Sequence, residues 1–154
     1  MNAQQTTKVQ HIRLACRGSA EIIKTIAVLR ENVNRYMNHP NEHIRKQYNL
    51  IRQNLGEILR RLLRMRESES AGELEISGGL AELREGLEKQ DILANGTLDQ
   101  LVRDDAIDSQ MATSLMNDSA FTHDIGMRLI EITEDIYIAE GVELEKPVEE
   151  LESV

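Results

Sequence analysis

The stretch that decides the fold class is residues 44–65, IRKQYNLIRQNLGEILRRLLRM. Seven of its apolar residues follow one another in alternating steps of four and three: Ile44, Tyr48, Ile51, Leu55, Ile58, Leu62 and Met65. This spacing places all seven on one face of an α-helix, as in helices that pack lengthwise against one another. Most other positions of the stretch are polar, and many are Arg or Lys. The stretch therefore predicts a long helix with one inward apolar stripe and a basic remainder.

Three more amphipathic stretches surround this one. The first runs from about Val9 to Met37, with its apolar face at Val9, Ile12, Cys16, Ile23, Ile26, Val33 and Met37. Pro40 is predicted to stand in the first turn of the helix that follows. The third stretch, about 74–101, is weakened by Gly78-Gly79 and Asn95-Gly96, so we expect a break or bend near one pair. The fourth runs from about Ile107 to Ala139, with Asp108 or Ser109 as its cap.

The composition agrees with a helical protein. The chain has 154 residues, enough for one domain, and only 3% are aromatic, which argues against a β-sandwich or barrel. No apolar run approaches the length of a membrane span, so a cytoplasmic chain is expected. We predict an all-α, antiparallel up-down bundle of three to four long helices over 9–140. A disordered N-terminus over 1–8 and an acidic flexible tail over 141–154 are expected to flank it.

Charge is distributed unevenly along the chain. Residues 1–66 hold 13 Lys and Arg against 4 Asp and Glu, a balance of +9, whereas residues 67–154 hold 5 against 23, a balance of −18. A basic helical hairpin beside an acidic one would explain this pattern without a partner. Alternatively, a basic face binds phosphate groups or anionic lipid headgroups; its candidate residues are Arg45, Lys46, Arg60, Arg61 and Arg64. The overall charge of −9 argues against nucleic acid as a partner.

Asp118 is the most informative polar residue, because the periodicity places it on the apolar face of the fourth stretch. A buried carboxylate needs a cation or a hydrogen-bond donor, and we expect Arg52 or Asn49 to supply one. Asn117 joins these three as a buried polar or ligand candidate. Two interpretations stay open: Asp118 fixes the register of the helices, or it binds a ligand or metal ion.

Glu131 and Asp135 form a second carboxylate feature. They lie one helical turn apart and could share a divalent cation, or they could simply belong to a solvated helix face. The chain contains no Gly-rich phosphate loop, no HExxH helix and no nucleophile elbow. We therefore expect no enzymatic activity and no catalytic residues.

Three segments resemble a known family. Residues 29–36 (LRENVNRY) and 39–52 (HPNEHIRKQYNLIR), together with residues 112–121 (ATSLMNDSAF), resemble the cytoplasmic C-terminal region of bacterial Na⁺/phosphate cotransporters. That region is PhoU-like, an all-helical bundle related to the phosphate-uptake regulator PhoU. PhoU proteins bind iron or zinc through E/D-x-x-x-D motifs, and Glu131 to Asp135 (EITED) matches the comparable stretch without the family's following His. This chain also holds at most one three-helix repeat plus a helix, whereas PhoU has two repeats.

The resemblance implies a non-enzymatic regulatory or accessory domain for Na⁺-dependent phosphate transport at the cytoplasmic face of the membrane. Its partners would be a membrane phosphate transporter or its membrane domain, with anionic lipid headgroups as a further binding surface. Two other functions stay open: a carboxylate-rich helical protein that binds a divalent, iron or zinc ion, and a helical oligomerisation module that pairs with a second copy.

Overall fold

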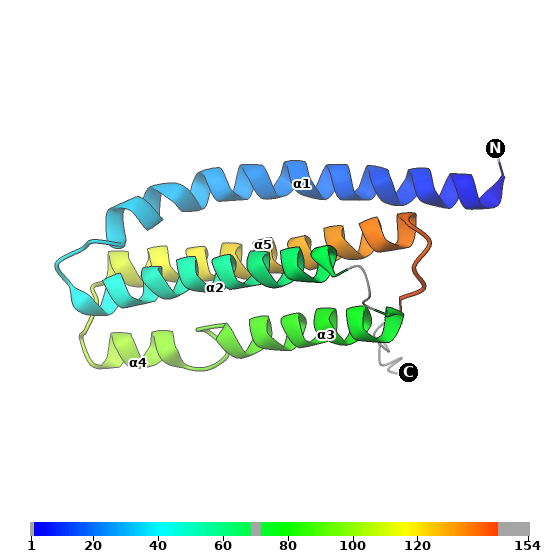
Figure 1. Cartoon of the computed structure of the whole chain (residues 1–154). Coiled ribbons are helices and arrows are strands. Elements are labelled where there is room, and N and C mark those ends of the chain that lie inside the picture. Colours follow the sequence, from blue (N-terminus) through cyan, green and yellow to red (C-terminus); the bar gives the residue numbers. More distant parts are fainter. Residues whose placement is uncertain (1, 69–71, 145–154) are drawn as a thin grey trace, which may run out of the picture.

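The computed structural model describes residues 2–68 and 72–144, which form five helices and no strand (Figure 1). They are α1 (Ala3–Tyr36), α2 (Glu42–Glu67), α3 (Glu73–Gln90), α4 (Thr97–Arg103) and α5 (Ser109–Ala139). In Figure 1, α2 and α5 run in one direction, and α1, α3 and α4 run in the other. The predicted all-α class is confirmed for these residues. The third predicted helix is divided into α3 and α4.

The first helix begins earlier than predicted. Asn2 caps it, because the Asn2 side chain accepts a hydrogen bond from the Gln5 backbone at 2.9 Å and the Gln5 side chain accepts one from the Asn2 backbone at 3.0 Å. This reciprocal capping box satisfies two amides that would otherwise lack partners. The expectation of disorder over 1–8 is therefore wrong for residues 2–8. The predicted acidic tail lies outside the described residues from position 145 onward.

The turn between α1 and α2 is built around Asn41. Its side-chain oxygen accepts hydrogen bonds from the backbone amides of His43 and Ile44, at 2.9 and 3.2 Å, so Asn41 is the N-cap of α2. Pro40 precedes this cap, and its predicted place in the first helical turn is wrong. The Asn41 side-chain amide also donates to the Ala106 carbonyl at 2.8 Å, which ties this turn to the connection before α5.

The connections on either side of α4 follow the sequence signals. Gly96 adopts a φ of +78°, in the left-handed region that glycine enters without strain, and the chain breaks between α3 and α4 there. The predicted break near Asn95-Gly96 is therefore confirmed. Asp108 caps α5 by accepting a hydrogen bond from the Met111 amide at 2.8 Å, as expected.

Helix α5 contributes to both apolar clusters of the core. One cluster, near the α1–α2 turn, includes Leu115 and Ile125 of α5, and the other, toward the opposite end, includes its Ile130 and Tyr137. The α2 stripe faces these clusters as predicted, because five of its members are buried and the other two are half-buried. The buried members are Ile44, Tyr48, Ile51, Ile58 and Leu62; the half-buried ones are Leu55 and Met65.

Helix α1 packs mainly on α5, but with a different face from the predicted one. Its buried residues are Ala15, Gly18, Ile22, Leu29 and Tyr36. Much of the predicted apolar face is exposed instead: Val9, Ile12, Cys16, Ile23 and Ile26. Gly18 explains the choice, because a Cβ atom there would lie 3.0 Å from Ile132 of α5, so glycine permits a close approach of the two helices.

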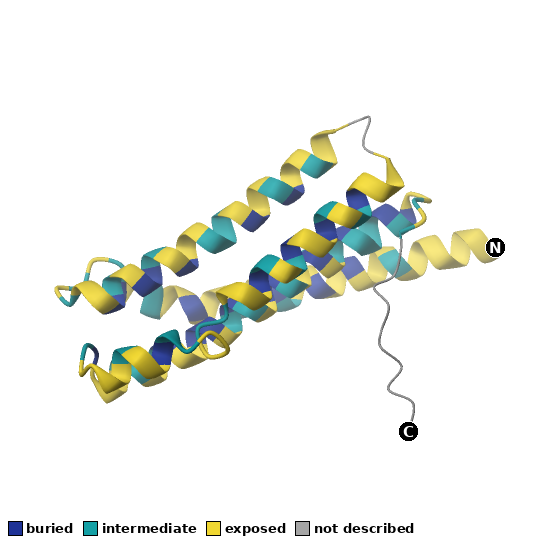
Figure 2. Cartoon of the chain, turned by 90° about the horizontal axis from the view of Figure 1, so that it is seen from below, coloured by how far each residue is buried: buried dark blue, intermediate teal, exposed yellow. Residues whose placement is uncertain are grey.

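Within the described ranges, no helix combines the length and the apolar character needed to cross a lipid bilayer. Figure 1 and Figure 2 both show the N-terminal end of α1 running past the rest of the bundle. Most of that end is coloured as exposed in Figure 2, so α1 is the helix least covered by its neighbours at that end.

Candidate functional site

Asp118 lies in the core, as the sequence predicts. Its side chain is 1% exposed, and the Tyr48 hydroxyl of α2 donates a hydrogen bond to Asp118 Oδ2 at 2.5 Å. The Asn32 side chain of α1 lies near this carboxyl and lowers its pKa. Tyr48 in turn stacks on Tyr36, with ring centroids 4.9 Å apart. The carboxyl group therefore joins α1, α2 and α5 at the level where all three helices meet.

The surroundings of Asp118 favour neutral groups. Burial raises the pKa of the Asp118 carboxyl, while the hydrogen bond from Tyr48 and the nearby Asn32 side chain lower it by a smaller amount. Burial, followed by the hydrogen bond to Asp118, raises the pKa of the Tyr48 hydroxyl, so Tyr48 keeps its proton. This arrangement holds three helices in register, and it presents no accessible carboxylate to a substrate.

The predicted partners of Asp118 are wrong. Asn49 donates hydrogen bonds to the Met37 and Arg45 carbonyls, both at 3.0 Å, and so closes the α1–α2 turn. The Arg52 guanidinium donates to the Asn49 side-chain oxygen at 2.9 Å and is exposed. Asn117 is also exposed. Asn49 and Arg52 lie beside the apolar stripe of α2, and Asn117 lies beside the buried face of α5. Tyr48, by contrast, is a member of the α2 stripe itself.

The two carboxylates predicted as a metal pair have separate partners. Asp135 Oδ1 lies 2.6 Å from Nδ1 of His11 in α1, and Glu131 Oε2 lies 3.3 Å from the Arg128 guanidinium. Among residues 2–68 and 72–144, no group of three or more His, Cys, Asp or Glu side chains is placed to hold a metal ion. Sequence reasoning missed His11, which occupies the same heptad stripe as Ala15, Gly18 and Ile22 of α1.

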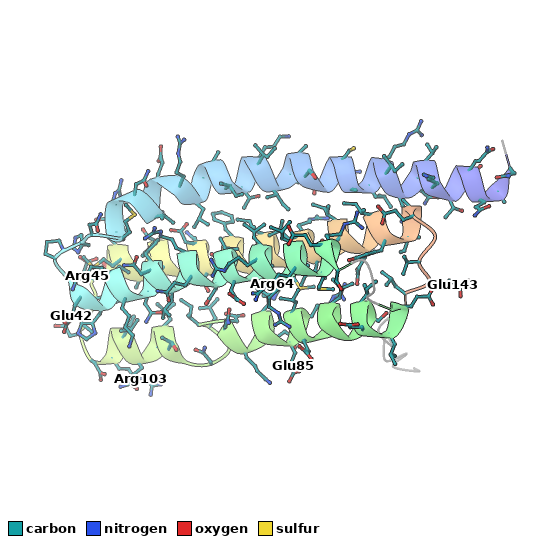
Figure 3. All side chains as sticks on the ribbon, viewed as in Figure 1. Glu42, Arg45, Arg64, Glu85, Arg103 and Glu143 are labelled. Carbon is teal, nitrogen blue, oxygen red and sulfur yellow. The ribbon has the colours of Figure 1, made fainter. Side chains whose placement is uncertain are left out.

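The predicted basic face of α2 is largely engaged within the chain. Arg60 and Arg64 both pair with Glu57 of the same helix, and Arg61 pairs with Glu82 of α3 at 2.8 Å. Arg45 donates to the His39 carbonyl at 2.7 Å. Figure 3 shows Arg45 near the start of α2 and Arg64 near its end. Lys46 is exposed and makes no ion pair with a described residue.

Ion pairs also join the other helices. Arg66 forms a two-pronged pair with Glu140, at 2.7 and 2.8 Å, and this contact lowers the pKa of Glu140. Arg84 of α3 pairs with Glu134 of α5 at 2.6 Å. Arg66–Glu140 and Arg61–Glu82 each join the basic half of the chain to the acidic half, and so agree with the interpretation in which basic and acidic helices flank one core.

The most extensive candidate surface is the outward side of α1. Val9, Ile12, Ile23 and Ile26 are exposed there, by 38%, 46%, 68% and 45%. With 3.6 residues per turn they share one side of the helix with Cys16, which is also exposed. We call this set, Val9, Ile12, Cys16, Ile23 and Ile26, the outer apolar stripe.

A basic stripe runs beside the outer apolar stripe. We define it as Arg13, Arg17, Lys24 and Arg35, which fall on an adjacent side of α1 at 100° per residue. Of these four, only Arg17 forms an ion pair with a described residue, to Glu21 at 3.1 Å. The outer side of α1 thus presents apolar and cationic groups together.

Comparisons of the chain with protein-family models, curated proteins and solved structures found no match. The functional interpretation therefore depends on the residues and contacts of the chain itself. Three features are available: the Asp118 cluster, the His11–Asp135 contact and the outer side of α1. Of these three, only the outer side of α1 exposes apolar side chains over a large area, together with cationic groups that mostly form no ion pair with a described residue.

Proposed function

We propose that this chain is a non-enzymatic regulatory or accessory module, PhoU-like, that acts on Na⁺-dependent phosphate transport at the cytoplasmic face of the membrane. It attaches there through the outer side of α1. The observation that carries the proposal is the pairing of the outer apolar stripe with the basic stripe on one exposed helix.

This pairing suits a membrane surface. An interfacial helix places its apolar side at the boundary between headgroups and acyl chains, while Lys and Arg bind anionic headgroups. Each Lys or Arg near an anionic leaflet contributes about 1 kcal/mol of attraction. The exposed end of α1, which extends past the bundle in Figures 1 and 2, is free to lie along such a surface.

The link to phosphate transport rests on the resemblance of residues 29–52 and 112–121 to the cytoplasmic region of Na⁺/phosphate cotransporters. In this chain the first segment includes the α1–α2 turn, and the second lies at the start of α5. The transporter or its membrane domain is the proposed protein partner, and lipid headgroups provide the surrounding surface.

Vesicle co-sedimentation tests the attachment. The full chain should sediment with vesicles of phosphatidylglycerol and phosphatidylcholine, and added salt should weaken binding because it screens exposed charges. The triple variant Arg13→Glu, Arg17→Glu, Lys24→Glu should lose this binding while it keeps its helical circular dichroism spectrum.

The matched control is the triple variant Arg60→Glu, Arg61→Glu, Arg64→Glu. It changes the charge by the same amount, but on α2, where the arginines have glutamate partners. We expect it to keep most of the vesicle binding. Equal binding by wild type and the α1 variant, or no binding by wild type, would reject attachment through α1.

Transport is tested in the source cells. Deleting the chain should change the initial rate of radiolabelled orthophosphate uptake, and the wild-type chain should restore that rate where the α1 triple variant does not. Unchanged uptake after deletion would reject the link to phosphate transport, whatever the vesicles show.

A helical oligomerisation module is the second candidate, because the outer apolar stripe could also pack on a second copy. Light scattering after gel filtration distinguishes the two: an oligomer that Ile23→Glu dissociates favours self-association. The metal-binding alternative has less support, since Glu131 and Asp135 have separate partners. Elemental analysis of the purified protein tests it directly.

A further inference from the structure

A cleft lies between α2, the α3–α4 connection and the first half of α5. Its volume is about 480 Å³, within the range of small-molecule sites. One part of the lining is apolar and includes Ile51 of α2, Ile92 of the connection and Leu115 of α5. Neither α1 nor its two outer stripes line the cleft, so binding there can be tested separately from the proposed function.

Two largely buried residues present polar side chains to the cleft without a hydrogen-bond partner among the described residues. Gln47 of α2 is 8% exposed and Ser119 of α5 is 9% exposed, and both line the cleft. In the part of the chain that the structure describes, neither the Gln47 amide nor the Ser119 hydroxyl forms a hydrogen bond. Neither residue holds an enclosed side-chain polar atom without a partner, so both groups are open to solvent through the cleft. Both groups are therefore placed to bind something that enters the cleft.

More hydrogen-bonding groups surround these two. Asn54 of α2, Gln90 at the end of α3 and His123 of α5 line the cleft, and none of their side chains bonds to a described residue. An amide offers a donor and an acceptor on one plane. Several such groups beside an apolar wall suit a flat ligand whose edge carries both donors and acceptors.

The charge at the cleft selects the sign of the ligand. Lys46 lines the cleft and forms no ion pair with a described residue, whereas Lys89 is held by Glu85 at 2.5 Å. Asp91 is the one acidic residue of the lining, and its carboxylate accepts a hydrogen bond from the Leu93 amide at 2.9 Å. The described lining carries two lysines against one aspartate, and this positive balance favours an anionic group, which a lysine binds as a point charge.

We propose that this cleft binds a small anionic ligand with a flat, hydrogen-bonding body, of the chemical class of a mononucleotide. The body lies against the apolar wall, and its edge pairs with the Gln47 amide and the Ser119 hydroxyl. The anionic group lies at Lys46.

Isothermal titration of the full chain tests this site. Adenosine and guanosine 5′-monophosphates are the probes, at up to about 1 mM, with the corresponding nucleosides and orthophosphate alone as references. At least one nucleotide should bind more tightly than both its nucleoside and orthophosphate. Gln47→Leu and Lys46→Ala should each weaken that binding about tenfold, the effect of losing one buried or charged hydrogen bond.

Gln53→Leu and Lys8→Ala are the matched controls, because both residues are exposed, neither lines the cleft and neither belongs to the two outer stripes of α1. They should bind like wild type, and circular dichroism confirms that every variant is folded. Three results would each overturn the proposal: no heat from any nucleotide, binding of orthophosphate as tight as that of the nucleotide, or equal affinity in wild type and both cleft variants.

Discussion

Tyr48→Phe removes the hydroxyl that donates to the buried Asp118 carboxyl and changes little else in shape. The hydrogen bond is 2.5 Å long and the carboxyl is 1% exposed, so no solvent replaces the lost donor. A hydrogen bond to a charged group contributes about 1.5–3 kcal/mol, and above the folded pKa of Asp118, where its carboxyl is ionised, we expect the free energy of unfolding to fall by that amount. For a chain of this size the melting temperature should fall by about 3–12 °C.

A double-mutant cycle in urea, followed by circular dichroism at a pH above the folded pKa of Asp118, isolates the contact. On the Asp118→Asn background the bond joins two neutral groups, so Tyr48→Phe should destabilise by only about 0.5–1.5 kcal/mol. Tyr36→Phe is the matched control, since Tyr36 stacks on Tyr48 and is buried without bonding to Asp118. The reasoning is refuted if Tyr48→Phe leaves stability unchanged, or if its effect is the same on both backgrounds.

Two more predictions follow from the packing and the buried carboxyl. Burial raises the pKa of Asp118 above its ordinary 3.8, so the folded state holds the proton more tightly than the unfolded state does. Wild type should therefore lose stability relative to Asp118→Asn as the pH rises from about 4. The difference in the free energy of unfolding should level off above the folded pKa. Urea unfolding at several pH values measures this, and a flat difference contradicts it. Gly78→Ala, where a Cβ meets nothing, should stabilise by up to about 1 kcal/mol. Gly126→Ala should destabilise by about 1–3 kcal/mol, because its Cβ would lie 2.6 Å from buried Leu87; equal melting temperatures for the two variants would contradict the packing.

The sequence predicts well where the helices of this fold lie. It predicts less well which face of each helix packs on its neighbours. The α2 stripe is unambiguous, because its seven apolar positions leave only one continuous apolar side. Helix α1 has two candidate sides, and the one with more large aliphatic residues is exposed. Ala15 and Gly18 line the buried side, where small residues let the backbones approach, and a count of hydrophobic residues undervalues such positions.

The burial of Asp118 could be predicted, but its partners could not. Periodicity places Asp118 on the packed face of α5. It does not indicate which residues of the neighbouring helices lie opposite Asp118 along the bundle. Tyr48 belongs to the apolar stripe of α2, so the pattern predicts a core residue and does not indicate that the Tyr48 hydroxyl donates a hydrogen bond. Asn32 lies on the α1 side that the pattern did not select. Both partners follow once the correct faces of α1 and α2 are turned toward α5.

Because α5 contributes to both apolar clusters, the order of synthesis matters for this chain. The ribosome releases α1, α2, α3 and α4 before Ser109, and until then the faces that pack on α5 have nothing to cover them. Translation proceeds at about 5–20 residues per second, and α5 ends 103 residues after α1, so the α1 face stays uncovered for about 5–20 seconds. A chain stalled before α5 should therefore be bound by chaperones and cut by proteases, whereas a chain that has released α5 should resist both.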